Sequence, residues 1–510
     1  MPDLFGRPKT ACYQFGFGSD FGGSSMKRIL LAAAAVMTLA GAANAEPLSA
    51  QDRASIKASV DKAGPRLGQV AKQIWDLAEV GYQEHKSSAL LQAELKKAGF
   101  KVEAGVAGMP TAFVASFKAG DGPVIGILAE YDALPGLAQA AAPERKPLAG
   151  VASHACGHHV FGAASVQAAI SLKEWMVANG VKGEVRVYGS PAEEGGSGKV
   201  YLVRAGLFDD VDATIHWHPS DNNSASQGVS LANISGKFRF SGASAHASGA
   251  PWRGRSALDG VEVLNDAVNM MREHVPDGTR IHYVITDGGS APNVVPEKAE
   301  AYYYVRHADP QIVRDVMERV KKAAEGAAMA TETKVSFEQT GGVYNMLPNA
   351  TLATVMDENL RDVGGVVWDA QERAFAEAMQ KQLPTTTAKL ESAAEVQPMK
   401  IGGAGGGSTD VADVSWVTPT VGMSAATWVP GTPGHSWQAV AAGGTSMATK
   451  GGVVAAKSMA LTGAALLRDP ATIEKAKAEL KEKRGADFQY KAMVGDRPPP
   501  LDYRAKAGAE

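Results

Sequence analysis

Short apolar runs of the kind found in buried strands alternate with longer segments of helical periodicity over most of this chain. The predicted strands are residues 111–117, 124–128, 184–188 and 212–217. Helical spacing of apolar residues marks the segments 67–77, 87–98 and 161–178. Because strands separated by helices of this length pair side by side in one sheet, the alternation predicts an α/β fold.

One stretch departs from this alternation. From residue 231 to residue 338 the predicted order is strand, helix, strand, strand, helix, strand, which is typical of a small α+β sandwich. The α/β texture then resumes, with a glycine-rich loop at 402–407 and a helix of small residues at 451–467. We therefore predict one α/β domain, residues 46–230 and 339–470, interrupted by an inserted α+β domain at 231–338.

Both ends of the chain differ from the domains between them. A basic start at 26–28 (MKR), an apolar run at 29–40 and the small residues 43–45 (ANA) have the three-part layout of a secretory signal peptide. The apolar run is shorter than the ~20 residues that a membrane span needs. We expect residues 1–45 to be a leader with a signal peptide and the protein to be exported to the periplasm; a buried or anchoring helix is the alternative. Residues 471–510 are charged and Pro-rich, and they are expected to form a loosely packed tail.

The charge balance narrows the possible partners. The chain of 510 residues has a formal net charge of -3 and no block of like charge. It therefore lacks the basic field that attracts nucleic acid.

The cysteines raise a separate question. The chain has two, Cys12 and Cys156, and removal of the leader would leave Cys156 as a lone thiol in an oxidising compartment, which is unusual. Metal ligation would explain it, because it holds the sulfur as a bound thiolate; simple burial is the alternative.

Side chains that bind metals gather near the ends of the predicted strands or in loops. These side chains are Cys156, His158, Glu193, Glu194, His216, His218 and His435. In an open α/β sheet the carboxyl ends of the strands collect side chains into one crevice. A thiolate, imidazoles and a carboxylate together suit Zn²⁺ or Mn²⁺. The pattern predicts a metal site, although each residue alone would more often be a solvated loop side chain.

The two adjacent glutamates have different predicted roles. Neighbouring side chains cannot easily reach the same atom, so one carboxylate can bind metal while the other faces the metal-bound water. The metal lowers the pKa of that water towards about 7, and the free carboxylate can then take its proton and pass it to the leaving amine. The pattern by itself leaves Glu193 and Glu194 interchangeable.

Eight segments carry a resemblance to a known family. In chain order they are AEYDALPGL, HACGHH, GSPAEEGGSGK, DDVDATIHWHP, GASAHAS, APNVVPEKAEAYYYVR, GGSTDVADVSW and GTPGHSWQ. They resemble the zinc aminoacylase/carboxypeptidase superfamily of metallopeptidase amidohydrolases, and most of all its branch that includes the p-aminobenzoyl-glutamate hydrolases. The resemblance spans about 52–467. It implies a di-metal catalytic α/β domain, with a pair of Zn or Mn ions, and an inserted ferredoxin-like α+β lid that also dimerises.

The resemblance also implies roles for single residues. The metal ligands would be Cys156, His158, Glu194, His218 and His435, with Cys156 bridging both ions and Glu193 as the general acid/base. His216 remains a rival of His218, since the two lie two residues apart on one predicted strand. Asp132, and similarly Asp410, resemble aspartates that orient a ligand from behind; a turn aspartate is the alternative. His159 stands where many relatives carry Asp or Asn, which changes the surroundings of the ligands.

Lid residues complete the implied site. His246 matches a histidine that reaches an active site across the dimer and helps to hold the substrate carbonyl oxygen. Asn293 and Arg306 match substrate-contacting positions, and Arg255 is a weaker candidate for the substrate carboxylate, which an arginine binds through two donors. The alternative for Arg306 is a sheet-edge arginine paired with a surface acid.

The motifs together predict a metal-dependent amidohydrolase that cleaves the amide bond of N-acyl amino acids, for example aromatic acyl-glutamates. A dipeptidase for β-alanyl or similar unusual dipeptides is the main alternative, because both substrates need a carboxylate anchor and a carbonyl between two metals. Glu193 disfavours a third possibility, an inactive binding protein, since a binder has no use for a base beside a metal ligand. We expect a small-molecule substrate, a homodimer or related hetero-oligomer, no membrane span and no nucleic-acid partner.

Overall fold

The computed structural model describes residues 47–383, 387–404 and 407–504. The predicted leader and signal peptide, residues 1–45, lies outside these ranges. Within them, every helix is too short or too polar to cross a membrane.

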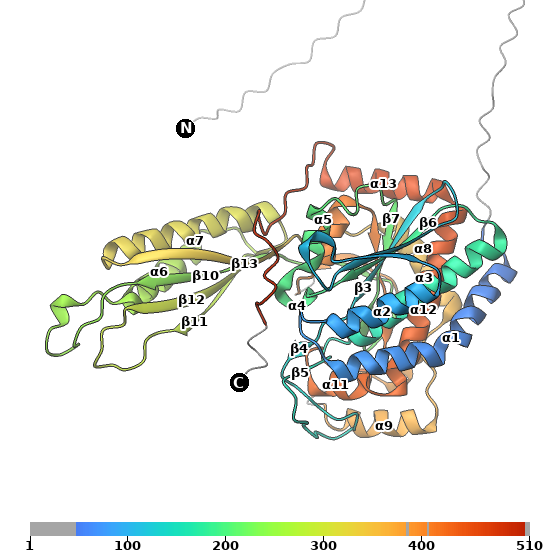
Figure 1. The fold of residues 1–510 in the computed structure, drawn as a ribbon, viewed down its shortest axis with the longest axis horizontal. Helices are drawn as coiled ribbons and strands as arrows, with labels where there is room; N and C mark the ends of the chain where they lie inside the picture. Colours follow the sequence, from blue (N-terminus) through green and yellow to red (C-terminus); the bar gives the residue numbers. More distant parts are fainter. Residues whose placement is uncertain (1–46, 384–386, 405–406, 505–510) are drawn as a thin grey trace, which may run out of the picture. The chain divides into compact units, whose positions relative to one another are not determined.

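A six-stranded sheet forms the centre of the first domain (Figure 1). In spatial order its strands are β1 (Lys101–Ala104), β2 (Phe113–Lys118), β6 (Glu184–Ser190), β3 (Val124–Glu130), β7 (Ala213–Ile215) and β15 (Thr420–Val421). The four strands from β6 to β15 run parallel, whereas β1 and β2 pair antiparallel at one edge. The central strand β3 is buried over almost its whole length, as expected for a strand with helices on both faces. The parallel strands therefore bring their carboxyl ends to one edge of the sheet.

The long helices around this sheet come from both ends of the chain. They are α1 (Ala50–Leu77), α2 (His85–Lys97), α3 (His158–Asn179), α8 (Ala350–Val363), α12 (Ser446–Arg468) and α13 (Pro470–Arg484). Helices α1, α3 and α12 pack against one another. Helix α3 also lies close to β3, because a Cβ on Gly162 would come within 2.6 Å of the Glu130 carbonyl oxygen. Glycine at this position lets the N-terminal half of α3 lie close beside the carboxyl end of β3.

Shorter elements connect the larger ones. They are β4 (Leu134–Pro135), β5 (Ala152–Ser153), α4 (Glu193–Gly196), α5 (Gly198–Arg204), β8 (His218–Ser220), β9 (Gln227–Val229), α9 (Ala370–Gln380), β14 (Ile401–Ala404), α10 (Val411–Val417), β16 (Ser424–Ala426), α11 (Trp437–Gly443) and the 3-10 turns Val106–Gly108, Pro251–Arg253, Arg272–His274 and Leu390–Ala394. The strand predicted at 212–217 is shorter in the structure: β7 ends at Ile215, and from His218 the chain pairs with β16 instead. The strand prediction was too long because periodicity does not reveal where a strand changes partner.

The inserted domain has the predicted order of elements. They are β10 (Ala232–Ser241), α6 (Ala257–Met271), β11 (Arg280–Asp287), β12 (Lys298–His307), α7 (Pro310–Ala330) and β13 (Lys334–Val343). The four strands form an antiparallel sheet in the order β11-β12-β10-β13, with both helices on one face (Figure 1). Burial alternates along β12, so one face of the sheet packs under the helices and the other does not. The predicted fold class, a catalytic α/β domain with an inserted ferredoxin-like α+β lid, is confirmed.

The last part of the described chain is packed, contrary to the loosely packed tail expected from its composition. Helix α13 buries Ile473 and Leu480, and the C-terminal segment, residues 485–504, buries Met493 and Val494. The expectation failed because a few apolar residues spaced among charges and prolines are enough to fix a segment to the surface of a larger domain.

Candidate metal centre

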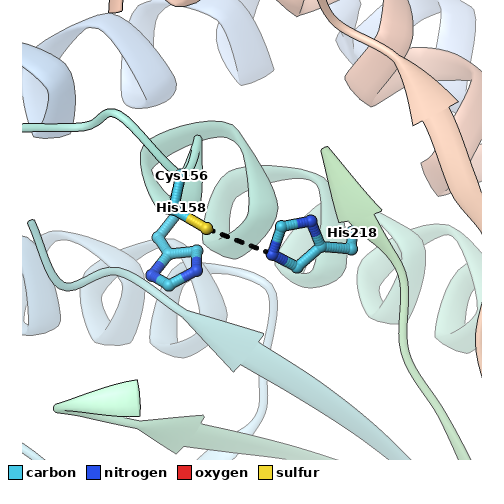
Figure 2. Close-up of side chains that lie close together, drawn as sticks. All are labelled: Cys156, His158 and His218. Atoms are coloured by element: carbon cyan, nitrogen blue, oxygen red, sulfur yellow. Dashed lines mark hydrogen bonds between the residues drawn. The ribbon is translucent and has the colours of Figure 1, made fainter. Parts of the chain in front are cut away.

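Two chain segments bring the three candidate ligands of the first group together. Cys156 and His158 flank the start of α3, and His218 opens β8 (Figure 2). The Cys156 Sγ lies 3.4 Å from His218 Nε2, and one ligand atom from each of the three residues lies within 4.8 Å of the others. Gly157 between them has a φ of 81°, and a Cβ there would come within 2.6 Å of Pro219. Only glycine suits this turn, which aims Cys156 and His158 at the same space.

Hydrogen bonds fix how the two histidine rings are protonated. The Nδ1–H of His218 donates to the carbonyl oxygen of Pro219 at 2.7 Å, and that of His158 donates to Asp132 at 2.8 Å. With a proton on Nδ1, Nε2 is the nitrogen of each ring that is left to bind a cation, and it faces the cluster. A carboxylate or carbonyl behind the ring is the usual support of a metal-bound histidine.

A second group shares the thiol. Cys156, Glu194 and His435 also offer ligand atoms within 4.8 Å of one another, and His435 Nε2 lies 3.3 Å from Glu194 Oε1. His435 is held by its backbone N–H, which donates to the carbonyl of Ala155 at 3.0 Å. Its side chain remains 57% exposed, so this group lies at the open side of the cluster.

The turn that carries the two glutamates is held from several sides. Ala192 has a φ of 56°, and its N–H donates to Glu84 at 2.9 Å. The N–H of Glu194 donates to Asp132 at 2.9 Å, so one aspartate supports both His158 and this turn. Positive φ values are costly for residues other than glycine and persist only where neighbours enforce them. The backbone therefore presents the two carboxylates in a fixed way.

The neighbouring glutamates belong to different groups. Glu194 falls with Cys156 and His435, whereas Glu193 falls within 4.8 Å of His158 and Glu130. Burial raises the pKa of the Glu193 carboxyl well above its ordinary value, and the charges of Glu130 and Glu194 raise it further. A carboxyl of raised pKa beside a ligand cluster is suited to carrying a proton.

The donor set suits divalent cations. Burial raises the pKa of the Cys156 thiol, so a nearby cation is what would hold it as a thiolate. His158 Nε2 lies 3.1 Å from Glu130 Oε2, and two acceptors at that distance repel unless a proton or a cation lies with them. The mixture of sulfur, nitrogen and oxygen donors is that of zinc and related ions. The two groups can hold divalent metal ions that share Cys156.

Three further buried residues surround this cluster. Lys199 Nζ is fully buried, 2.6 Å from Glu130 and 2.7 Å from Asp410. Sequence reasoning missed Glu130 and Lys199, although both lie within the quoted motifs. Alternation along a strand offered a signal for the first, because Glu130 and Asp132 are two residues apart and so share a face of the chain. The position of Asp410, 211 residues after Lys199, carries no local signal for this pairing.

Two further histidines of the motifs, His159 and His216, have contacts away from the ligand groups. His216 packs on Gly422, where an added Cβ would overlap its ring, and it belongs to none of the ligand groups among the described residues. His159 Nε2 lies 2.9 Å from the carbonyl oxygen of Gly443, at the end of the helix that follows His435. Burial lowers the pKa of His159 to about 4, so it is a neutral support of that helix.

Two of the predicted lid residues lie on an exposed part of the lid. His246 is exposed, and its Nδ1 accepts from the backbone N–H groups of Ser248 and Gly249. Asn293 lies beside it, since its carbonyl accepts from Ala247 N at 3.0 Å. Within the part of the chain that the structure describes, neither side chain is brought into the ligand groups.

The two candidate arginines differ in their surroundings. Arg255 forms an ion pair with Glu332 at 2.8 Å and bonds to carbonyls of the lid. Arg306 donates to Ser408 at 3.3 Å, across the junction with the catalytic domain, and its buried Nε has no hydrogen-bond partner. In the described part of the chain Arg306 pairs with no carboxylate, unlike the sheet-edge arginine that was its alternative.

Comparison with known proteins finds a matching domain model and several similar enzymes. Residues 232–332 match the model of a peptidase dimerisation domain. The chain is similar to two different subunits of the p-aminobenzoyl-glutamate hydrolase of Escherichia coli K12. It is 39% identical to one of them over 444 residues, covering 81% of this chain and 92% of that protein. It is 25% identical to the other over 386 residues, covering 66% and 88%.

A mammalian enzyme is also among the relatives. The chain is 29% identical over 439 residues to a mouse Xaa-Arg dipeptidase, covering 83% of this chain and 91% of that protein.

Solved structures give the same fold. A dinuclear metal-binding M20-family peptidase of Bacillus subtilis aligns with a TM-score of 0.54 at 19% identity, covering 80% of this chain and 99% of that one. An aminobenzoyl-glutamate utilization protein of Klebsiella pneumoniae aligns with a TM-score of 0.53 at 19% identity, covering 76% and 96%.

Proposed function

The chain belongs to the M20 family of peptidases and amidohydrolases, and from that premise we propose that it hydrolyses N-acyl amino acids whose amino-acid half carries a free carboxylate. Enzymes of this family cleave amide bonds, and the relative with 39% identity is named for p-aminobenzoyl-glutamate. That substrate and its close analogues are the proposed class.

The observation that carries the proposal is the pair of ligand groups that share Cys156 beside Glu193. Two divalent ions bound there would polarise the scissile carbonyl and acidify a water molecule. Glu193 then takes a proton from the attacking water and gives it to the leaving nitrogen, so the water ends as the acid hydroxyl and the amine hydrogen. Asp132 accepts hydrogen bonds from both His158 and the backbone of Glu194, and so fixes the ligand and the glutamate turn relative to each other. We propose Cys156, His158, Glu194, His218 and His435 as the ligands, and Zn or Mn as the ions.

The lid supplies the remaining groups from a second chain. A dimerisation domain is present, and its edge strand β11 exposes Val284 and Ile285. An exposed apolar strand edge is suited to pairing with a copy of itself. In such a homodimer His246 and Asn293 reach the partner's cluster and hold the carbonyl oxygen, and Arg306 receives the substrate carboxylate. A hetero-oligomer is the second possibility, because the chain is similar to two different subunits of one hydrolase.

A second substrate class has one observation in its favour, the 29% identity to an Xaa-Arg dipeptidase. Its substrates, and β-alanyl dipeptides likewise, end in a carboxylate and differ mainly in the acyl half. The same catalytic groups serve either class.

We further propose that the protein acts after export, in the periplasm. The signal-peptide layout at 26–45 supports this. Fractionation of cells that express the full chain, with N-terminal sequencing of the mature form, tests it.

A substrate panel tests the function. The Zn- and Mn-loaded protein is assayed with p-aminobenzoyl-glutamate, N-acetyl amino acids, Xaa-Arg dipeptides and β-alanyl dipeptides, and release of the free amine is measured. The proposal expects the highest kcat/KM for an acyl amino acid. Preference for a dipeptide would favour the alternative, and no hydrolysis of any amide with either metal would overturn both.

A further inference from the structure

The C-terminal segment (485–504) follows a fixed path across the catalytic domain (dark red in Figure 1). Arg204 on α5 donates to the carbonyl oxygen of Arg497 at 2.8 Å, and Arg497 donates to the carbonyl of Gln339 in β13. Gln83 donates to the carbonyl of Leu501 at 2.8 Å. These contacts lead the segment past the junction with the lid to the turn that carries the catalytic glutamates.

Tyr503 joins the segment to that turn. Its hydroxyl donates to the carbonyl oxygen of Glu194 at 3.1 Å, and its ring meets the edge of Tyr82 at 5.7 Å. Tyr82 in turn donates to the carbonyl of Gly196 at 2.7 Å. Any side chain at Gly81 would overlap the Tyr503 hydroxyl. The segment therefore packs directly behind a proposed metal ligand.

The next residue, Arg504, extends along the same turn. Its Nη2 would lie 3.7 Å from a Cβ placed on Gly195, and the guanidinium stacks over the Tyr503 ring at 5.2 Å. Its Nη1 is buried and has no hydrogen-bond partner among the described residues. Its positive charge also acts on the His435 ring.

The charges around the ligand cluster explain why an arginine at this position can bind substrate. The site gathers the carboxylates of Glu130, Glu193 and Glu194, which the two proposed divalent ions would offset, and Lys199 is already shared between two carboxylates. A substrate carboxylate that approaches needs a positive group that is not yet paired. A buried guanidinium nitrogen without a partner can receive it through charge-assisted hydrogen bonds.

We propose that Arg504 is a substrate-binding residue, whose guanidinium receives a carboxylate of the amino-acid half of the substrate beside His435. The proposal depends on the proposed function for the substrate class. It adds that the C-terminal segment completes the pocket of its own chain, whereas the lid residues serve a partner. A substrate with two carboxylates could then engage Arg504 and Arg306 together, which favours acidic amino acids such as glutamate.

Binding of a product analogue tests this without turnover. Metal-loaded wild type, Arg504→Gln and Lys491→Gln are titrated with L-glutamate by calorimetry. Lys491 is exposed in the same segment, so its substitution removes the same charge away from the site. Loss of a charged hydrogen bond should raise the Kd about 10- to 100-fold in Arg504→Gln and leave Lys491→Gln unchanged. Equal affinity in all three proteins, or no glutamate binding by wild type, overturns the proposal.

Kinetics with matched substrates identify the carboxylate. The substrates are p-aminobenzoyl-glutamate, its α-amide and p-aminobenzoyl-glutamine, each of the latter two lacking one carboxylate. Arg504→Gln should raise KM for the first substrate, and the effect should disappear for the analogue that lacks the contacted carboxylate. An equal loss on all three substrates would mean that Arg504 only supports the fold of the turn. Failure of wild type to hydrolyse any of them would contradict the proposed function, while the titration still decides whether Arg504 binds the anion.

Discussion

The catalytic domain and the lid present their candidate functional side chains in opposite ways. In the catalytic domain His158 is fully buried and Glu194 is 9% exposed, and each has a second residue or backbone group that holds it. On the lid His246 and Asn293 lie exposed, and the imidazole of His246 is held only by its own loop. A set of ligands that must meet one ion needs a rigid frame. A group that acts on another chain must instead remain accessible until the chains associate.

Removal of metal tests the buried ligand cluster of the catalytic domain, and it should have the largest effect on activity. Because the thiol and the buried carboxylates are arranged for cations, dialysis against a chelator should abolish amide hydrolysis, and Zn²⁺ or Mn²⁺ should restore it. Metal analysis should find about two ions per chain. Full activity in a preparation shown to be metal-free would end the metal hypothesis.

Substitution of the glutamates separates the base from the ligand. Glu193→Gln keeps the shape but removes the base, so kcat should fall by about 10²–10⁴-fold while the metal content stays unchanged. Glu194→Ala should lower the metal content directly, since it removes a ligand. If Glu193→Gln lost metal and Glu194→Gln kept it, the two roles would be exchanged.

The lid side of the comparison is tested by complementation. His246→Ala should keep its metal but lose about 10²–10³-fold in kcat, the usual effect of removing a donor to the oxyanion. When His246→Ala and Glu193→Gln chains are mixed and reassembled, mixed dimers contain one site with both intact groups, so about a quarter of the activity should return.

Two controls accompany that experiment. Each variant alone, taken through the same dissociation and reassembly, should remain inactive. Full activity of a wild-type protein shown to be monomeric, or no recovery in mixed dimers of confirmed composition, would exclude a role for His246 across the dimer.

The smallest expected effect is on the stability of the fold, and it comes from Asp413, a buried carboxyl outside the ligand groups. Burial raises the pKa of Asp413 to about 7, although Tyr490 and the backbone of Tyr344 donate to it. The folded state therefore keeps this proton at pH values where the unfolded chain has lost it. The stability that the protonated form contributes is fully present below about pH 4 and is lost as the pH rises to about 7.

The side chain of Asp413→Asn cannot ionise, so this variant should not lose that stability. Its free energy of unfolding relative to wild type should therefore rise by up to about 1.4 kcal/mol per pH unit over that range. Urea unfolding of both proteins at several pH values measures this gain. The matched control is Asp121→Asn, because Asp121 is fully exposed and its substitution removes the same charge from the surface. A difference between Asp413→Asn and wild type that stays constant with pH would show that burial does not control this carboxyl.

Much of the fold followed from local pattern, because the period of apolar residues reports directly on helix and strand. The inserted lid was predicted in its correct order from β10 to β13. Where the pattern was ambiguous it misled: the strand that was predicted to carry both His216 and His218 is divided between two sheets. The packing of residues 485–504 was also missed, since it depends on a surface that lies far away in the sequence.

By itself the sequence determined which residue types could bind metal and that most of them follow strands, because side-chain chemistry and strand direction are local properties. Only the tertiary structure decided which way each side chain points. It turned His218 toward the thiol and His216 onto Gly422, joined Lys199 to Asp410 and brought Arg504 to the glutamate turn. These choices depend on backbone torsions and on contacts between segments hundreds of residues apart, which no local pattern records.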